Sequence, residues 1–314
     1  MAGRLGAVWT EPSPPFARRR RSVRAILPVG ELCRAGAVGG LSAFVALLPA
    51  LRGLFAMAAL SAALVAGGAL SGCGLLGGGQ PSAADLVGRS GFDWSEVRTE
   101  HFTIHYEPGA PGAERADEVG RDAEESLDQI LGFLGEPGYD GPLDLFFVPS
   151  RERMVSLLGA ETNGIAFPET GVLVFLVNDH FRISARHELF HVVAMNRWGT
   201  PDLWVNEGGA VCVSEVWYGH PLHGLARHLR ESDRWIPLDT LSRKFRGEDD
   251  RISYPLAGSF VQFILESWGR DGVRAAWDGG TKELSRFTGL SLEQLEEGWV
   301  AAVEEASADG IEYP

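Results

Sequence analysis

The chain has 314 residues, of which 45% are hydrophobic, and a formal net charge of −14 at pH 7. This length allows one or two domains with a sizeable core. The charge is unevenly distributed along the chain. Residues 1–72 hold eight arginines and two acidic side chains. Residues 73–314 hold the remaining 20 basic and 40 acidic side chains, a net charge of −20. So acidic a region argues against nucleic-acid binding and against adhesion to anionic lipid, since both ligands are themselves negative.

The first 34 residues combine proline, glycine and a run of four arginines at 18–21, without apolar periodicity. This composition is typical of a disordered leader or of a start codon placed too far upstream. A twin-arginine export signal is the alternative, but Pro28 and Glu31 interrupt the approach to the apolar segment that follows.

A compact apolar run covers residues 54–70 and ends in Leu70-Ser71-Gly72-Cys73. This ending resembles the lipobox of bacterial lipoproteins, which implies cleavage before Cys73 and a lipid on Cys73 that anchors the protein to a membrane of the cell envelope, on the exported face. A plain transmembrane helix is the alternative, since this length of apolar chain can span a bilayer. The glycine-rich residues 74–82 favour the lipoprotein, whose folded part would hang on a flexible tether.

We therefore divide the chain into a leader with signal peptide over residues 1–72, a lipidated cysteine and tether over 73–98, a folded domain over 99–306 and a tail over 307–314. Cys212 is then the only cysteine of the folded domain, so no disulfide forms within it. Its place in an apolar helical segment predicts a buried, inert thiol.

The residue pattern in the first half of the folded domain predicts a β-sheet covered by helices. Residues 102–106 alternate in type and read as a strand, while 143–148 and 171–177 are continuous apolar runs typical of buried strands. Helical spacing of apolar residues predicts an amphipathic helix over 111–134, and a short helix is expected over 150–158.

His101 and His105 fall on one face of the first predicted strand. They could form a metal pair, but packing or surface histidines are favoured, because this strand lies far along the chain from the motif described next.

The segment His187-Glu188-Leu189-Phe190-His191 has the form H-E-x-x-H, inside a helix predicted over residues 182–198. Residues four apart on an α-helix project from one face, so both imidazoles can bind one metal ion. Glu188 is placed to act as general base on an attacking water. A catalytic zinc usually takes three protein ligands, so a third donor must come from another element.

Glu207 is the predicted third ligand. Gly199-Thr200-Pro201 suits a helix end followed by a new helix, predicted over 201–218 with Thr200 as its N-cap. Seven residues separate His191 from Trp198 and six separate Pro201 from Glu207, which correspond to about 10.5 Å and about 9 Å of helix. Antiparallel packing would therefore bring Glu207 level with His191 and complete a site for Zn²⁺. Chance is a poor alternative, because a random match to three fixed positions occurs about once in tens of thousands of residues.

The H-E-x-x-H motif followed by Trp204-x-x-Glu207-Gly208-x-Ala210 resembles the gluzincin zinc metallopeptidases, specifically the peptidase MA-like group. The resemblance runs from about residue 100 to residue 306 and includes residues 99–106 and 254–261. It implies a zinc peptidase acting on a peptide or protein substrate. Thermolysin-like gluzincins carry an acidic residue four places after the glutamate ligand, where this chain has Val211, so the residue that orients His187 or His191 is not identified.

Tyr254 is the preferred donor to the oxyanion that forms during hydrolysis, because the resembling family often has a tyrosine at the head of this helix. A structural tyrosine is the alternative. His220, His223 and His228 are the other donors considered. Glu215 falls near the face of Glu207, where it could be an acid that supports the metal ligands, but a surface charge is favoured.

The resemblance also implies an edge strand that binds the substrate backbone, for which residues 164–167 and the strand over 171–177 are candidates, with an ordinary core strand as the alternative. The G-x-M-E-N segment of related aminopeptidases has no counterpart in residues 164–169, so an endopeptidase is favoured over an exopeptidase.

The expected fold class is α+β, with a small mixed sheet preceding a mostly helical zincin-like subdomain that carries the HExxH active-site helix. Its last helix is expected to begin after a Ser291 cap. Three functions remain open: a membrane-anchored zinc endopeptidase, a catalytically inactive peptidase-like scaffold or binding lipoprotein, and a zinc hydrolase of a non-peptide amide. The oligomeric state is not predicted.

Overall fold

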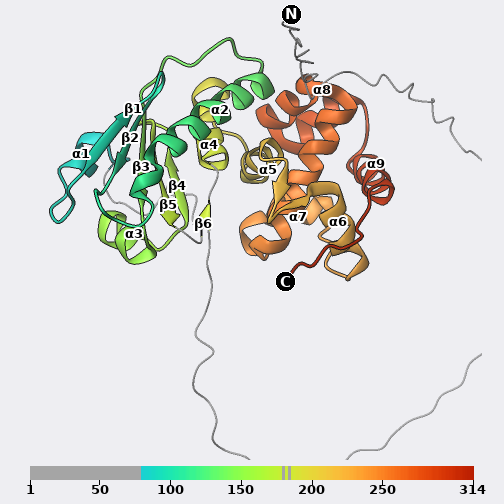
Figure 1. Cartoon of the computed structure of the whole chain (residues 1–314). Helices are drawn as coiled ribbons and strands as arrows, with labels where there is room; N and C mark the ends of the chain where they lie inside the picture. Colours follow the sequence, from blue (N-terminus) through green and yellow to red (C-terminus); the bar gives the residue numbers. More distant parts are fainter. Residues whose placement is uncertain (1–78, 179–180, 183–184) are drawn as a thin grey trace, which may run out of the picture. The chain divides into compact units, whose positions relative to one another are not determined.

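The computed structural model describes residues 79–178, 181–182 and 185–314 (Figure 1). The predicted leader, signal peptide and lipidated Cys73 lie outside the described residues. None of the helices within the described ranges has the length and apolar character needed to cross a membrane.

A mixed sheet forms the first half of the described part of the chain (Figure 1). Its main strands lie in the order β1-β2-β3-β5-β4, and β6 also pairs with β5. The pairs β2 with β3 and β3 with β5 are parallel, whereas the remaining pairs are antiparallel. The strands are β1 (Ser95–Arg98), β2 (Phe102–Tyr106), β3 (Leu143–Val148), β4 (Gly164–Phe167), β5 (Val172–Asn178) and β6 (Phe181–Arg182).

Helices cover both faces of this sheet, which explains why β3 and β5 are apolar along most of their length. Along β3, Leu145 and Phe147 face the core shared with α2 (Ala116–Leu134). Phe146 and Val148 face a second core that includes residues of α1 (Ala83–Val87) and α3 (Arg151–Leu158). A strand buried on both faces needs no polar alternation.

Three predicted boundaries are wrong. Helix α2 begins at Ala116 rather than near residue 111, because residues 113–115 form a separate 3-10 turn. The predicted tether ends too late, since α1 begins after a Ser82 cap and β1 pairs with β2. The helix expected from residue 182 starts at Arg186, and residues 181–182 instead pair with β5.

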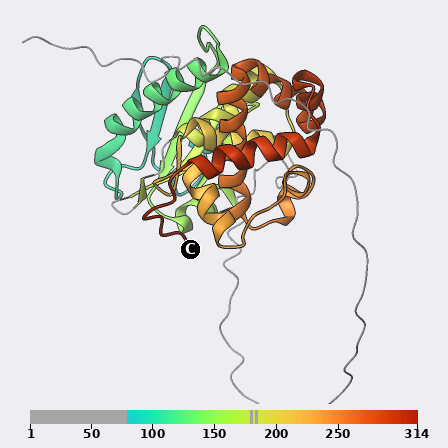
Figure 2. The same cartoon turned by 90° about the vertical axis from the view of Figure 1, so that its right-hand side faces the viewer.

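The second half is mostly helical, as predicted, with one short hairpin of β7 and β8 (Figures 1 and 2). Its last helix begins after a Ser291 cap and buries Leu295, Trp299 and Val303. The elements are α4 (Arg186–Trp198), α5 (Leu203–Val213), β7 (Val216–Trp217), β8 (His220–Pro221), α6 (Leu222–Glu231), α7 (Leu238–Lys244), α8 (Asp250–Thr288, interrupted by non-helical glycines) and α9 (Leu292–Glu305).

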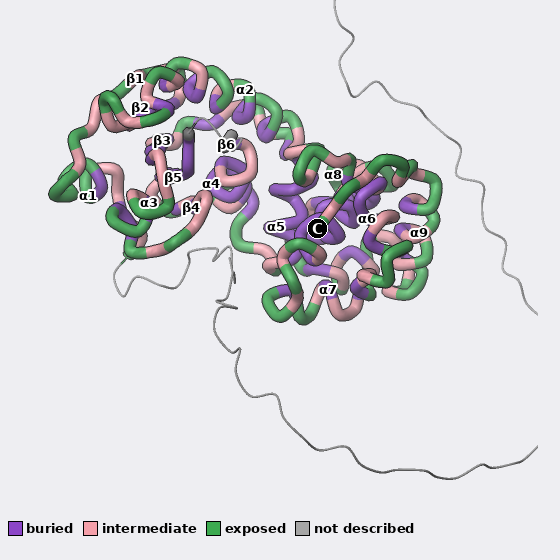
Figure 3. The backbone as a smooth tube through the Cα atoms, turned by 60° about the horizontal axis from the view of Figure 1, so that its bottom comes forward, coloured by how far each residue is buried: buried purple, intermediate pink, exposed green. Residues whose placement is uncertain are grey.

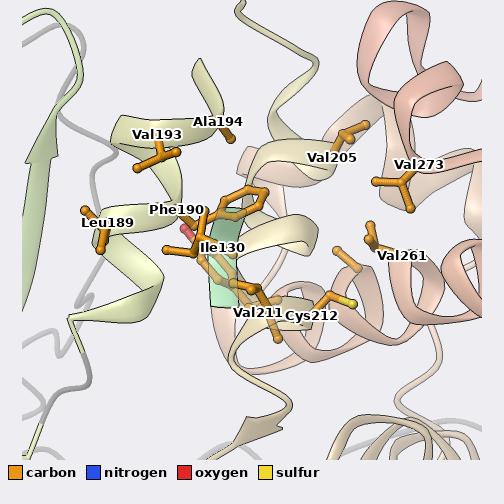
Figure 4. Close-up of a cluster of buried hydrophobic side chains, with 14 of the residues drawn as sticks. Ile130, Leu189, Phe190, Val193, Ala194, Val205, Val211, Cys212, Val261 and Val273 are labelled. Carbon is orange, nitrogen blue, oxygen red and sulfur yellow. The ribbon is translucent and has the colours of Figure 1, made fainter. Parts of the chain in front are cut away.

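Helix α5 lies between α4 and α8 and is buried along almost its whole length (Figures 3 and 4). Two glycines allow the close approach. A Cβ on Gly208 would lie 2.8 Å from the carbonyl oxygen of Ala257 in α8, and one on Gly209 would lie 2.6 Å from the ring of Phe190 in α4. The buried Cys212 thiol is part of the same layer, as predicted.

Helix α5 is shorter than the 201–218 predicted for it. It starts at Leu203 after Asp202, so the Thr200 cap is wrong. The helix stops at Val213, and Glu215 follows it as an exposed residue with φ 64°. Glu215 is therefore a surface charge, as expected.

Candidate metal centre

His187, His191 and Glu207 meet at the junction of α4 and α5. The chain leaves α4 at Gly199, whose φ of 82° lets it turn back into α5. The Nε2 atom of His187 lies 3.4 Å from Oε2 of Glu207, and Nε2 of His191 lies 3.5 Å from the same oxygen. Ligand atoms of all three side chains lie within 4.8 Å of one another.

The two separations between the imidazole nitrogens and Oε2 of Glu207 fit a single zinc ion. Bonds of about 2.0 to 2.1 Å in tetrahedral geometry place neighbouring ligand atoms about 3.4 Å apart. Two imidazoles and one carboxylate are also the donor set of catalytic zinc sites that keep a fourth position open. His187, His191 and Glu207 are thus able to hold a metal ion.

The electrostatics of the centre require a positive charge beside Glu207, which is 1% exposed. Burial raises the pKa of this carboxyl, but His191 and His187 lower it more, and it ends well below its usual range. Burial likewise lowers the pKa of His191, while Glu207 raises it to about 9. A buried carboxylate is costly without a cation, and either a proton on His191 or a metal ion can supply it.

Asn206 is a site residue that sequence reasoning missed. Its Oδ1 lies 3.0 Å from Nδ1 of His191, and both side chains are buried. An amide oxygen only accepts, so Nδ1 of His191 donates to it and Nε2 faces Glu207, where it can bind a metal ion once it has lost its own proton. Val211, at the position where thermolysin-like gluzincins carry an acid, packs against Gly258 instead. The sequence feature that could have predicted this role is a polar asparagine directly before Glu207, in a helix that is otherwise apolar.

Glu188 lies beside strand β4. A Cβ on Gly164 would come within 2.7 Å of Oε1 of Glu188, so a larger residue there would force this carboxylate to move. Burial raises the pKa of Glu188, and His187 and His191 oppose that rise without cancelling it. A carboxylate with a raised pKa is a better proton acceptor, which suits a general base.

Tyr254 lies near the head of α8, at the edge of the centre, and is 5% exposed. Its ring centroid is 6.4 Å from that of His187, at an interplanar angle of 23°. The ring also stacks on Trp217 at 5.5 Å. Tyr254 is therefore close enough to the centre to remain the candidate oxyanion donor.

Two of the other candidate histidines, His223 and His220, have partners of their own on α8 and near the end of the chain. Nδ1 of His223 lies 2.8 Å from Oγ of Ser259, and its Nε2 lies 3.4 Å from Glu266. Nε2 of His220 contacts the carbonyl of Glu312. His228 lies half-buried on α6. These contacts favour structural roles.

His101 and His105 pair with carboxylates rather than with each other. Nδ1 of His101 lies 2.7 Å from Glu124, and Nε2 of His105 lies 2.8 Å from Asp144. They act as packing histidines, as favoured from the sequence.

No protein-family model matches this chain, and no curated protein does. Among solved structures, the chain is similar to native leukotriene A4 hydrolase from Saccharomyces cerevisiae, with a TM-score of 0.37 and 11% sequence identity. The match covers 65% of this chain and 39% of that enzyme, so the chain spans well under half the length of the protein it matches.

Proposed function

We propose that this protein is a zinc-dependent peptidase that cleaves peptide bonds within a chain. The observation that carries the proposal is the convergence of His187, His191 and Glu207 directly beside the partly buried Glu188. A zinc ion bound there would polarise the scissile carbonyl and lower the pKa of a water molecule.

The side chains of the centre then have distinct tasks. Glu188 accepts the proton of the attacking water and passes it to the leaving amine. Asn206 holds His191 in the tautomer that binds metal. Tyr254 donates a hydrogen bond to the oxyanion as it develops on the attacked carbonyl.

Strand β4 is the proposed binding edge for the substrate backbone, because it is at the end of the sheet order and lies beside Glu188. Leu176 N donates to O of Asn163, the residue just before this strand, and the register pairs Ile165 with Val174, so the odd-numbered residues bond to the partner strand β5. By the alternation of an antiparallel ladder, the N–H and C=O of Ala166 point to the free edge. A peptide can add there as a further strand.

We also propose that Cys73 carries a lipid and anchors the protein to a bacterial envelope membrane, on the exported face. The support is the Leu70-Ser71-Gly72-Cys73 ending of an apolar run, followed by glycine-rich residues. Mass spectrometry of the membrane-extracted protein tests this proposal, because a diacylated Cys73 at the mature N-terminus is expected, and Cys73→Ser should abolish it.

The peptidase proposal is tested by zinc content and by zinc-dependent cleavage of unfolded protein. We expect about one zinc per chain, loss of zinc in His191→Ala, and retained zinc with lost cleavage in Glu188→Gln. Equal cleavage by Glu188→Gln and the parent protein would exclude the mechanism.

A catalytically inactive metal-binding scaffold is the second candidate. It is favoured by one observation, that His191 is oriented by the neutral amide of Asn206 rather than by a carboxylate. Bound zinc without cleavage of any unfolded protein would support it, whereas zinc-dependent cleavage would exclude it.

A further inference from the structure

The β7–β8 hairpin, which we define as residues 216–221, follows α5 and presents an exposed tyrosine beside the metal centre. Trp217 pairs with His220, so Tyr218 and Gly219 form the two-residue turn. Their φ values are 51° and 81°, as a type I′ turn requires. Tyr218 is 71% exposed, the largest exposure of any large hydrophobic side chain within the described residues.

Stability does not explain this tyrosine. The first position of such a turn is normally asparagine, aspartate or glycine, and a bulky side chain with positive φ is strained. Because the Tyr218 ring is mostly exposed, burial contributes little free energy to offset this strain. Strain of this kind persists mainly where a functional site needs the side chain.

Aromatic rings connect Tyr218 to the metal centre. Its ring centroid lies 5.5 Å from that of Trp217, whose ring lies 5.5 Å from Tyr254 and 6.4 Å from the ligand His187. The rings of Trp217 and Tyr218 therefore extend from a metal ligand to the solvent. A peptide with its scissile carbonyl at the metal centre would have neighbouring side chains within reach of these two rings.

Hydrogen bonds through Tyr313 hold the Trp217 ring in place. Its Nε1 donates to the hydroxyl of Tyr313 at 3.0 Å, and that hydroxyl donates to the carbonyl of Arg251 at 2.7 Å. The ring of Tyr313 also lies 6.0 Å from that of Tyr218. A ring fixed by such supports forms a surface that is ready to bind without rearrangement.

We propose that Trp217 and Tyr218 form a substrate subsite that binds an apolar side chain, preferably an aromatic one, next to the scissile bond. The proposal rests on the peptidase function proposed above. The occupant follows from the surface chemistry, because two aromatic faces meeting at 70° offer stacking and edge contacts to another ring. The net charge of −20 from residue 73 onward disfavours acidic substrate residues.

Cleavage mapping with the full-length protein in detergent tests the subsite. Reduced and alkylated casein is digested by the zinc-loaded parent protein and by Tyr218→Ala, Tyr218→Phe, Val216→Ala and Phe287→Ala. The last two variants remove exposed apolar side chains, one from the same hairpin and one from the distant end of α8. All fragments are sequenced by mass spectrometry, and the residues around each cleaved bond are counted.

We expect the parent protein to favour phenylalanine, tyrosine or leucine at one fixed position beside the cleaved bond. Tyr218→Ala should lower kcat/KM by about five- to tenfold for a peptide with phenylalanine at that position, the scale of a lost aromatic contact. The same peptide with alanine there should be affected less than about twofold, since no such contact exists to lose. Tyr218→Phe and both control variants should behave as the parent.

Binding gives a readout that is independent of turnover. In a Glu188→Gln background, the phenylalanine peptide should bind about five- to tenfold more weakly when Tyr218 is alanine, as measured by fluorescence polarisation. Zinc-dependent cleavage with the same side-chain preference in parent and Tyr218→Ala would overturn the subsite and leave the peptidase function standing. No zinc-dependent cleavage by the parent protein would overturn both.

Discussion

Asn206 Oδ1 accepts the Nδ1 proton of His191 at 3.0 Å, from the position immediately before the candidate ligand Glu207. One turn of α5 therefore supplies both a candidate metal ligand, Glu207, and the group that orients a second candidate ligand, His191. A neutral amide performs this orientation without adding a second negative charge beside Glu207.

Asn206→Ala should weaken zinc binding by about 10- to 100-fold, because His191 loses the bond that fixes its tautomer. Competition with a chromogenic chelator measures the affinity. Asn206→Asp should bind zinc more tightly than Asn206→Ala, since a carboxylate accepts the same proton. Unchanged affinity in Asn206→Ala would show that the bond is incidental.

Zinc affinity should rise with pH up to about 9 and then level off. In the metal-free protein His191 has a pKa of about 9, raised from 6.5 by Glu207. Below that pH zinc must displace the proton, so affinity should increase about tenfold per pH unit. Chelator competition between pH 6.5 and 10 checks the slope, and a flat profile below pH 9 would contradict the proposed competition.

The stability of the metal-free protein should depend on pH in the opposite sense. A histidine pKa raised by folding contributes stability that is complete below 6.5, the unfolded value, and is lost as pH rises through about 9. Urea unfolding in the presence of a chelator should therefore show a falling free energy of unfolding from pH 6.5 to 9. His191→Gln should lose this dependence.

Gly164→Ala should reduce cleavage while retaining zinc. Its Cβ would lie 2.7 Å from Oε1 of Glu188, so the general base must move, whereas His187, His191 and Glu207 are untouched. A displaced catalytic group costs about 100-fold in rate. Gly138→Ala is the control, because nothing lies within 4 Å of its Cβ position. Full activity in Gly164→Ala would argue against Glu188 as the base.

Gly208→Ala should destabilise the protein by about 1 to 3 kcal/mol, since the added methyl meets the Ala257 carbonyl at 2.8 Å. Gly132→Ala is the matched control on α2, where the Cβ position is open and exposed. The control should be stabilising by about 0.4 to 1 kcal/mol through the unfolded state. Urea unfolding measures both, and equal effects would show that α5 and α8 can separate at low cost.

Local patterns in the sequence predicted much of the site. His187 and His191 share a face because four residues make about one turn of any α-helix. Glu207 could be placed at their level from helix lengths and the Gly199 turn alone. The buried strands and the helix after Ser291 likewise follow from periodicity and capping chemistry, which act over a few residues.

Tertiary contacts decided what those patterns could not. Strand β1 forms because its backbone pairs with β2. Residues 95–98, which were predicted to belong to a flexible tether, are therefore part of the sheet. The role of Asn206 depends on a bond to His191 on the neighbouring helix. Trp217 is held beside the centre by Tyr313, which is 96 residues away in the chain. Periodicity reports only which face of an element is apolar, whereas these contacts depend on which elements pack together, and packing brings residues together at any separation in sequence.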